Sequence, residues 1–266
     1  MDPEWDSVRA QVRTALEEYG CFEALFNGAS VELRKALFEA SEEFFDLPLE
    51  TKLRTKSDKL YKGYAEAIGC DGANNPQKCR RSNLQALASR QHHLQKRLIQ
   101  KAEVGNLETG YRYPAISRKN VQSFAENLIA LDVKVRTMIM ESFGLEKYVE
   151  EHLNSARKHF QEQPGLNPHI DSHFLTILCQ NDVVDGVEIK AKDGEDWIKA
   201  KPSQGSSFLV IAGASLHLLL NGRVFPPFHR VVITGKKDRH VAGLFVLPKE
   251  GLFINALEEM VDDEAF

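Results

Sequence analysis

The second half of the chain changes from helical to strand-like hydrophobic spacing, and this change strongly restricts the fold. From Phe174 onward, short apolar or alternating runs follow one another closely, and Asp193-Gly194 and Asn221-Gly222 supply turn signals. We expect strands near residues 174–180, 186–191, 196–200, 206–212, 216–220, 229–234 and 239–247. Many closely spaced strands favour a sandwich or barrel over βαβ units.

The first half is predicted to be mainly helical. Asp2-Pro3-Glu4 is a typical helix start, and apolar residues recur at helical spacing from there to Gly20. A short strand is expected over 21–26, a second helix over 30–45, and a long amphipathic helix over 117–143. The chain is therefore expected to be α+β, with helices packed against a β core.

A possible metal motif lies just before the first of the later strands. His169 and Asp171 are two residues apart, so in an extended chain their side chains point to the same face. Together they supply two thirds of a 2-His-1-carboxylate triad, the open-sided site that suits non-haem Fe(II). His229, which opens a β-branched run directly after two prolines, is the candidate third ligand.

Four other polar residues are candidates for a role near this motif. Arg239 heads the last predicted strand, where its guanidinium can clamp a carboxylate through two parallel hydrogen bonds. His173 shares a face with His169 and Asp171 by alternation, so it could line the pocket mouth, although a structural role is the simpler interpretation. His217 is interpreted as a packed, hydrogen-bonded histidine, and His240 is expected to face outward.

With these residues in place, the chain resembles plant 2-oxoglutarate- and Fe(II)-dependent dioxygenases, through His169, Asp171, His229 and Arg239 in that order. The supporting matches are Asn167-Pro168-His169, Phe174-Leu175-Thr176-Ile177-Leu178, Leu219-Leu220-Asn221-Gly222-Arg223, Pro227-Phe228-His229-Arg230-Val231, Gly243-Leu244-Phe245, Tyr19-Gly20-Cys21-Phe22 and Phe45-Asp46-Leu47-Pro48. Within the family it is most similar to the branch that holds glucosinolate side-chain oxygenases and auxin oxidases.

The resemblance implies a double-stranded β-helix, or jelly roll, backed by N-terminal and central helices. It implies three regions: an N-terminal helical region (1–110), a long helix (111–150) and the jelly-roll domain (151–266). Fe(II) would be held by His169, Asp171 and His229, and the distal carboxylate of 2-oxoglutarate by Arg239. The reaction would consume O2, with ascorbate as reductant, and release succinate and CO2. A small specialised metabolite or hormone would be hydroxylated, dealkylated or desaturated.

Three departures from the family pattern keep alternatives open. The family's Arg-x-Ser is Arg239-His240-Val241 here, so a hydroxyl that helps to bind 2-oxoglutarate is absent. One hydrogen bond to a charged group is worth about 1.5–3 kcal/mol, or roughly ten- to a hundredfold in Kd. The strand before His169 is expected to be shortened, because residues 155–165 are polar, and the apolar strand that usually precedes the first helix is expected to be missing. The alternatives are a catalytically degenerate small-molecule or metal-binding protein and, more remotely, an iron oxidase that dispenses with 2-oxoglutarate.

Two segments bear on the substrate. By the resemblance, Tyr61-Lys62-Gly63-Tyr64 lies near the substrate mouth. Residues 79–101 are rich in Arg, Lys, Gln and His, where family members usually carry an acidic and aromatic stretch. This segment is interpreted as a surface helix, with a basic lid over an acidic substrate as the alternative.

Composition narrows the function classes. Of the 266 residues, 42% are apolar and 27% charged, and the net charge of −4 argues against a general nucleic-acid or membrane-surface binder. Cys21, Cys70, Cys79 and Cys179 lack CxxC spacing, which favours reduced thiols over a disulfide framework. There is no apolar run of transmembrane length and no signal-peptide pattern. We expect a cytoplasmic monomer that acts on a small molecule, without nucleic-acid or membrane partners.

Overall fold

The computed structural model describes residues 2–53, 115–162, 168–181, 186–200, 207–232 and 240–261. The predictions made for residues 61–64, for the basic segment 79–101 and for Arg239 lie outside these ranges.

The N-terminal helices begin and end where local signals place them. Helix α1 (Pro3–Glu18) starts with Asp2, whose side chain accepts a hydrogen bond of 3.0 Å from the Glu4 N–H. Gly20, with a φ of +69°, then turns the chain into strand β1 (Cys21–Leu25), because a left-handed backbone suits glycine. Helices α2 (Val31–Phe45) and α3 (Leu49–Leu53) follow.

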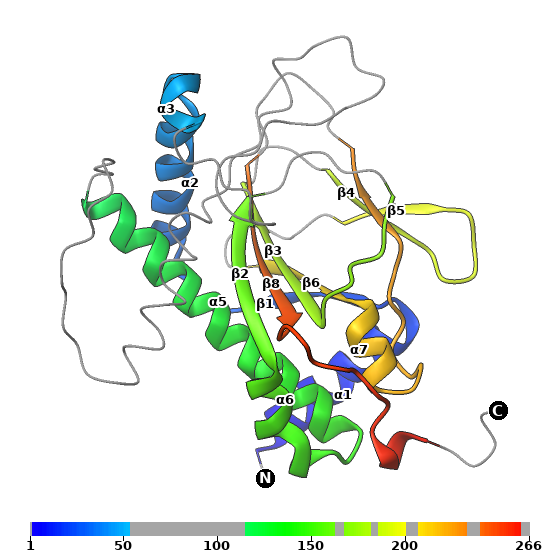
Figure 1. Cartoon of the computed structure of the whole chain (residues 1–266). Coiled ribbons are helices and arrows are strands. Elements are labelled where there is room, and N and C mark those ends of the chain that lie inside the picture. The colour runs from blue at the N-terminus through cyan, green and yellow to red at the C-terminus, as the bar shows by residue number, and fades with distance from the viewer. Residues whose placement is uncertain are drawn as a thin grey trace.

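The central helix α5 (Ala115–Ser142) carries the apolar stripe predicted from the sequence. Its buried apolar residues are Val121, Phe124, Ala125, Leu128, Leu131, Val135, Ile139 and Met140. A 3-10 turn, η2 (Glu146–Tyr148), and helix α6 (Val149–Ser155) follow it. Figure 1 shows α5 running beside the main sheet, where it packs against α1, α2 and two of the strands. Burying each large side chain contributes about 1.5–3 kcal/mol, so this stripe fixes the helical layer.

The β core consists of two antiparallel sheets. Its later strands are β2 (Ala156–Glu162), β3 (Leu175–Gln180), β4 (Val187–Lys190), β5 (Trp197–Lys199), β6 (Ser207–Ala212), β7 (His229–Val231) and β8 (Val241–Pro248). The larger sheet has the order β1-β6-β3-β8-β2 and the smaller one β5-β4-β7. Every residue of β3 and β6 is buried. These strands carry the helices on one face, while a second apolar cluster with residues of both sheets lies on the other.

The strand expected over 216–220 is wrong, because this segment is helix α7 (Ala214–Leu219). The His217 N–H bonds to the Gly213 carbonyl at 3.2 Å, and Leu220 bonds to Leu216 at 3.1 Å. Leu216 and Leu220 are buried but Leu218 is 55% exposed, which is helical rather than alternating burial. The Asn221-Gly222 turn signal is confirmed by two positive φ angles, but it ends a helix instead of joining two strands.

The expected shortening of the strand before His169 is also wrong. Strand β2 is seven residues long and pairs with β8 over its whole length, from Ala156 opposite Pro248 to Glu162 opposite Ala242. Its polar character fits its place at the edge of the sheet, since among the strands of the described ranges it pairs with β8 alone. Lys158 forms an ion pair of 3.0 Å with buried Asp132.

The structure contradicts the prediction for His240 and confirms part of the prediction for His217. His240 was expected to face outward, but it is 9% exposed, and its backbone exchanges hydrogen bonds with Asn181. His217 is hydrogen-bonded as predicted, through Nδ1 to the Val224 carbonyl at 2.7 Å, although it lies on α7 and not in a sheet.

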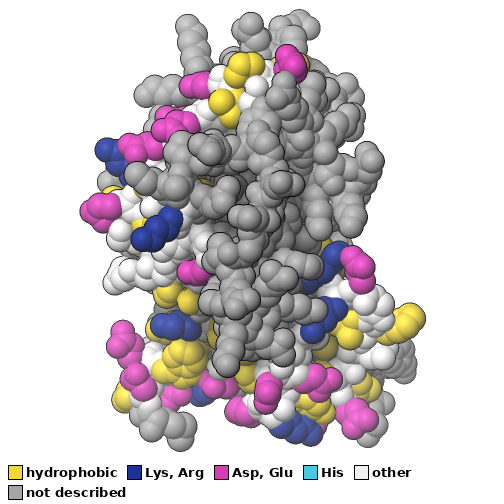
Figure 2. Space-filling view, turned by 60° about the vertical axis from the view of Figure 1, so that its left-hand side comes forward, with side chains coloured by type: hydrophobic (Ala, Val, Ile, Leu, Met, Phe, Trp, Pro, Cys, Tyr) yellow, Lys and Arg dark blue, Asp and Glu magenta, His cyan; other side chains and the backbone are white. Residues whose placement is uncertain are grey.

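None of the helices in the described ranges combines the length and the apolar character that a membrane span requires. On the face shown in Figure 2, acidic, basic and apolar side chains of the described residues are interspersed, without a continuous basic area.

Candidate metal centre

The segment 169–173, which carries the metal motif and is called the motif segment below, is held in place by backbone hydrogen bonds on two sides. On one side, His169 forms an antiparallel bridge with His229, with two N–H···O bonds of 3.0 Å each. On the other side, the Ala214 N–H donates to the Asp171 carbonyl at 2.8 Å, and Ser215 donates to the His173 carbonyl at 3.1 Å. The segment therefore lies fixed between β7 and the start of α7.

Gly213 makes this close approach possible. A Cβ atom at this position would lie 2.1 Å from the His173 carbonyl oxygen. Any larger residue would have to push the motif segment away from α7, which explains why glycine precedes the helix.

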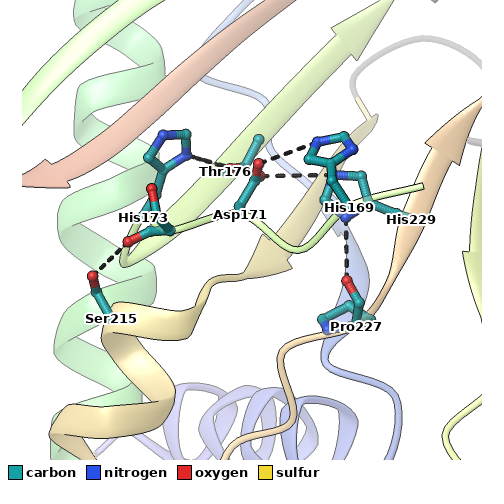
Figure 3. Close-up of polar contacts among 8 residues, drawn as sticks. His169, Asp171, His173, Thr176, Ser215, Pro227 and His229 are labelled. Atoms are coloured by element: carbon teal, nitrogen blue, oxygen red, sulfur yellow. Dashed lines mark hydrogen bonds and ion pairs between the residues drawn. The ribbon is translucent and has the colours of Figure 1, made fainter. Parts of the chain in front are cut away.

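The structure brings together the three residues that the sequence singles out as metal ligands. One ligand atom from each of His169, Asp171 and His229 lies within 4.8 Å of the others. The Nε2 of His169 is 3.5 Å from Oδ1 of Asp171, and the Nε2 of His229 is 3.8 Å from Oδ2. Figure 3 shows both imidazoles on the same side of the carboxylate.

The electrostatics favour an ionised Asp171 carboxylate beside a neutral His229 imidazole. Burial alone would raise the pKa of Asp171, but the hydrogen bond with His169, the neighbouring imidazoles and Thr176 outweigh it and lower the pKa to about 2. Burial lowers the pKa of His229 below its ordinary value, which keeps that ring neutral at pH 7. Deprotonated nitrogen and oxygen donors are what a divalent transition metal requires.

The second nitrogen of His229 supports the same arrangement. Its Nδ1 lies 3.2 Å from the Pro227 carbonyl oxygen, to which it can only donate. This tautomer leaves the Nε2 lone pair directed at the cluster, and metal-binding histidines are commonly oriented through such a bond. The residues present therefore fit an iron ion with a 2-His-1-carboxylate donor set.

His173 does not line the mouth of the site, contrary to one sequence interpretation. It is 6% exposed, and burial lowers the pKa of its imidazole. Its Nδ1 lies 3.4 Å from Oγ1 of Thr176, whose hydroxyl donates a short hydrogen bond to Oδ2 of Asp171. Sequence reasoning missed Thr176, although a hydroxyl within a fully buried apolar strand was a usable signal.

Comparison with known proteins assigns the family. A model described as 2OG-Fe(II) oxygenase superfamily matches residues 145–248, and one described as non-haem dioxygenase in morphine synthesis N-terminal matches residues 1–101. The chain is 42% identical to "Probable 2-oxoglutarate-dependent dioxygenase AOP1" of Arabidopsis thaliana, over 98% of this chain and 85% of that protein.

Solved structures show the same fold. AtDAO1, the dioxygenase for auxin oxidation 1 from Arabidopsis thaliana, in its binary complex with 2-oxoglutarate, matches with a TM-score of 0.79 and 22% identity, over 99% of this chain and 96% of that one. JOX2 in complex with 2OG, Fe and JA matches with a TM-score of 0.77 and 25% identity, over 99% and 78% of the two chains.

A jelly roll with a clustered His, Asp and His set defines the class of non-haem iron oxygenases. Within that class, the chain belongs to the 2OG-Fe(II) oxygenase superfamily, and its cofactors are Fe(II) and 2-oxoglutarate. The predicted jelly-roll fold, enzyme class and cofactors are thereby confirmed.

Proposed function

We propose that this dioxygenase oxidises a small specialised metabolite or plant hormone, with Fe(II) held by His169, Asp171 and His229. The observation that carries the proposal is that donor atoms of these three residues lie within 4.8 Å of one another. When bound, Fe(II) with 2-oxoglutarate and O2 supplies the oxidising chemistry. The contribution of the chain is to hold the donor atoms, orient them and limit the access of water.

The three residues differ in exposure, and this difference indicates from which side a small molecule can reach the site. Asp171 and His229 are 6% and 4% exposed, whereas the side chain of His169 is 32% exposed. Within the described part of the chain, the cluster is therefore reached from the side of His169. A small molecule entering there would meet the donor set while protein covers its opposite side.

Arg239 is proposed to bind the distal carboxylate of 2-oxoglutarate. It precedes β8 by two positions, and Val241, the first residue of that strand, lies in the apolar cluster that contains residues of both sheets. A guanidinium can bind a carboxylate through two parallel, charge-assisted hydrogen bonds. The side chain of Val241 offers no hydrogen bond, so the co-substrate is proposed to depend on Arg239 more heavily than in relatives with a hydroxyl there.

The test is succinate formation from 2-oxoglutarate by purified protein with Fe(II) and ascorbate under air. We expect the wild-type protein to turn over co-substrate slowly without a prime substrate, and to lose this activity in His169→Ala and Arg239→Ala. Arg223→Ala, which removes an exposed arginine with no part in the proposed roles, is the matched control and should keep wild-type turnover. Absence of succinate despite stoichiometric iron would instead support the catalytically degenerate alternative.

The substrate class is proposed from the names of the relatives. One structural neighbour is described as oxidising auxin, and the family branch predicted from the sequence also acts on small molecules. A panel of carboxylate hormones and sulfur-containing metabolites should be screened for compounds that stimulate succinate release. We further propose a monomer in the cytosol, which light scattering and a fluorescent fusion would check.

A further inference from the structure

A chain of three polar side chains leads from the buried interior to the metal-facing carboxylate. The Nδ1 of His173 contacts Oγ1 of Thr176 at 3.4 Å, and the same hydroxyl donates to Oδ2 of Asp171. Figure 3 shows His173 on the opposite side of Asp171 from His169 and His229. His173 is also absent from the cluster whose donor atoms could hold a metal.

The polarity of these bonds determines what His173 can do. A threonine hydroxyl has one proton and two lone pairs. Because its proton is directed to the carboxylate of Asp171, Oγ1 can only accept from His173. The imidazole must therefore carry its hydrogen on Nδ1, and the bonds run in one direction from His173 through Thr176 to Asp171.

The imidazole is held firmly enough to orient its neighbour. Its ring packs edge-on against Phe245 with centroids 5.1 Å apart, and the His173 carbonyl accepts a bond from the Ser215 N–H. Thr176 lies in β3 opposite Phe245 in β8, so the hydroxyl starts from a rigid strand. Because both His173 and Thr176 are held in place, the hydrogen bond from Thr176 favours one rotation of the Asp171 carboxylate about its side-chain bond.

We propose that His173 is a positioning residue that acts through Thr176 to fix the Asp171 carboxylate for metal binding. The proposal rests on the proposed function, because it needs Asp171 to be a metal ligand. Partners behind a ligand commonly change metal affinity by about 10–100-fold when they are removed. The hydroxyl of Thr176 should have the larger effect because it touches the carboxylate directly.

The first experiment measures Fe(II) affinity by anaerobic titration of the apo protein. His173→Leu and Thr176→Val should each weaken binding by about 10–100-fold. His173→Asn, whose amide N–H can replace Nδ1–H, and Thr176→Ser, which keeps the hydroxyl, should stay within a fewfold of wild type. The double variant His173→Leu/Thr176→Val should bind no more weakly than Thr176→Val alone, because the two residues act in series. Additive losses, or equal affinity of His173→Leu and His173→Asn, would overturn the proposal.

A second measurement does not depend on metal. Nitrogen-15 NMR of the histidine rings in the apo protein should show His173 as the Nδ1–H tautomer. In Thr176→Val the population of this tautomer should fall. If His173 is instead the Nε2–H tautomer, the proposed hydrogen-bond chain from His173 to Asp171 is overturned, even if iron binds tightly. If the tautomer is as expected but wild-type protein and Asp171→Ala bind iron equally poorly, the proposed metal site fails while the hydrogen-bond chain stands. Matched melting temperatures of the apo variants would show that lost affinity does not reflect unfolding.

Discussion

The backbones of His169 and His229 exchange two hydrogen bonds of 3.0 Å, so one antiparallel bridge sets the positions of both imidazoles. Their ring centroids are 4.3 Å apart, and both rings face the carboxylate of Asp171. His229 in turn pairs with Ile189 in the smaller sheet. The candidate metal site is therefore tied to strand pairing and not to a free loop, and changes that displace the segment should weaken metal binding and stability together.

Gly213→Ala is expected to show this coupling. Its φ of −107° is acceptable for alanine, so the effect comes only from the Cβ atom, which would lie 2.1 Å from the His173 carbonyl oxygen. Such overpacking costs about 1–3 kcal/mol. Urea denaturation should report this loss, and the Fe(II) titration should report weaker binding. Gly194→Ala is the control, since its nearest neighbour would be 3.8 Å away; equal behaviour of the two variants would contradict the packing argument.

Val241→Thr is expected to tighten 2-oxoglutarate binding. Threonine keeps the shape of valine and restores a hydroxyl near the proposed carboxylate site, which could lower the Kd by about tenfold for a gain of roughly 1.4 kcal/mol. Val241 is 2% exposed, so the free protein should lose stability unless the hydroxyl finds a partner. Calorimetric titration should separate the two effects. Val241→Ala, which has no hydroxyl, should not bind more tightly, and a matching gain there would point to lost bulk instead.

The parts of the fold that could be predicted are those with local signals. Asp2-Pro3 set the start of α1, the helical spacing of apolar residues revealed α5, and two prolines marked the start of β7 at His229. The metal motif could also be found, because its residues are ordered along the chain and flanked by recognisable strands. These features need no knowledge of distant contacts.

The parts that could not be predicted depend on distant neighbours. The run Leu216-His217-Leu218 fits a short strand as well as a helix, and backbone bonds from α7 to Asp171 and His173 accompany the helical choice. Strand β2 is polar, and β8 supplies its hydrogen bonds. The hydroxyl of Thr176 stands out in an apolar run of the sequence, but its bond to the Asp171 carboxylate becomes apparent only when β3 and the segment 169–173 are seen together.

The buried charge network on α5 is expected to be essential for stability. Arg136 forms two hydrogen bonds with Asp132, at 2.8 and 2.9 Å, and both side chains are fully buried. Asp132→Leu would leave the arginine without its anion, and breaking such a pair costs about 3–5 kcal/mol. Urea denaturation should show this loss. The double variant Asp132→Leu/Arg136→Met should recover part of it, because the buried guanidinium is removed together with its anion. Recovery should be incomplete, since Lys158 loses its ion-pair partner and the His152 carbonyl loses its donor. A double variant as unstable as the single one would show that packing dominates.

The last prediction concerns pH and His152. Burial, and secondarily the charge of Arg136, lowers the pKa of this imidazole from 6.5 to about 3. Below pH 6.5 the unfolded chain therefore takes up a proton that the folded protein refuses until about pH 3. The free energy of unfolding must fall as the pH drops through this window, by about 1.4 kcal/mol per unit for one group. Above pH 6.5 the contribution of His152 is constant.

His152→Leu removes this titration and should flatten the pH dependence. Between pH 6.5 and 4.5 the wild-type protein should lose about 2–3 kcal/mol more than the variant, as measured by urea denaturation at each pH. The depressed pKa of Asp171 also removes stability as the pH falls, but that loss is common to both proteins and cancels in the difference. The loss of the edge-on contact with Phe174, 4.9 Å between ring centroids, lowers the stability of the variant equally at every pH. Parallel curves for the two proteins would mean that His152 takes up its proton in the folded state, so the slope is the decisive quantity.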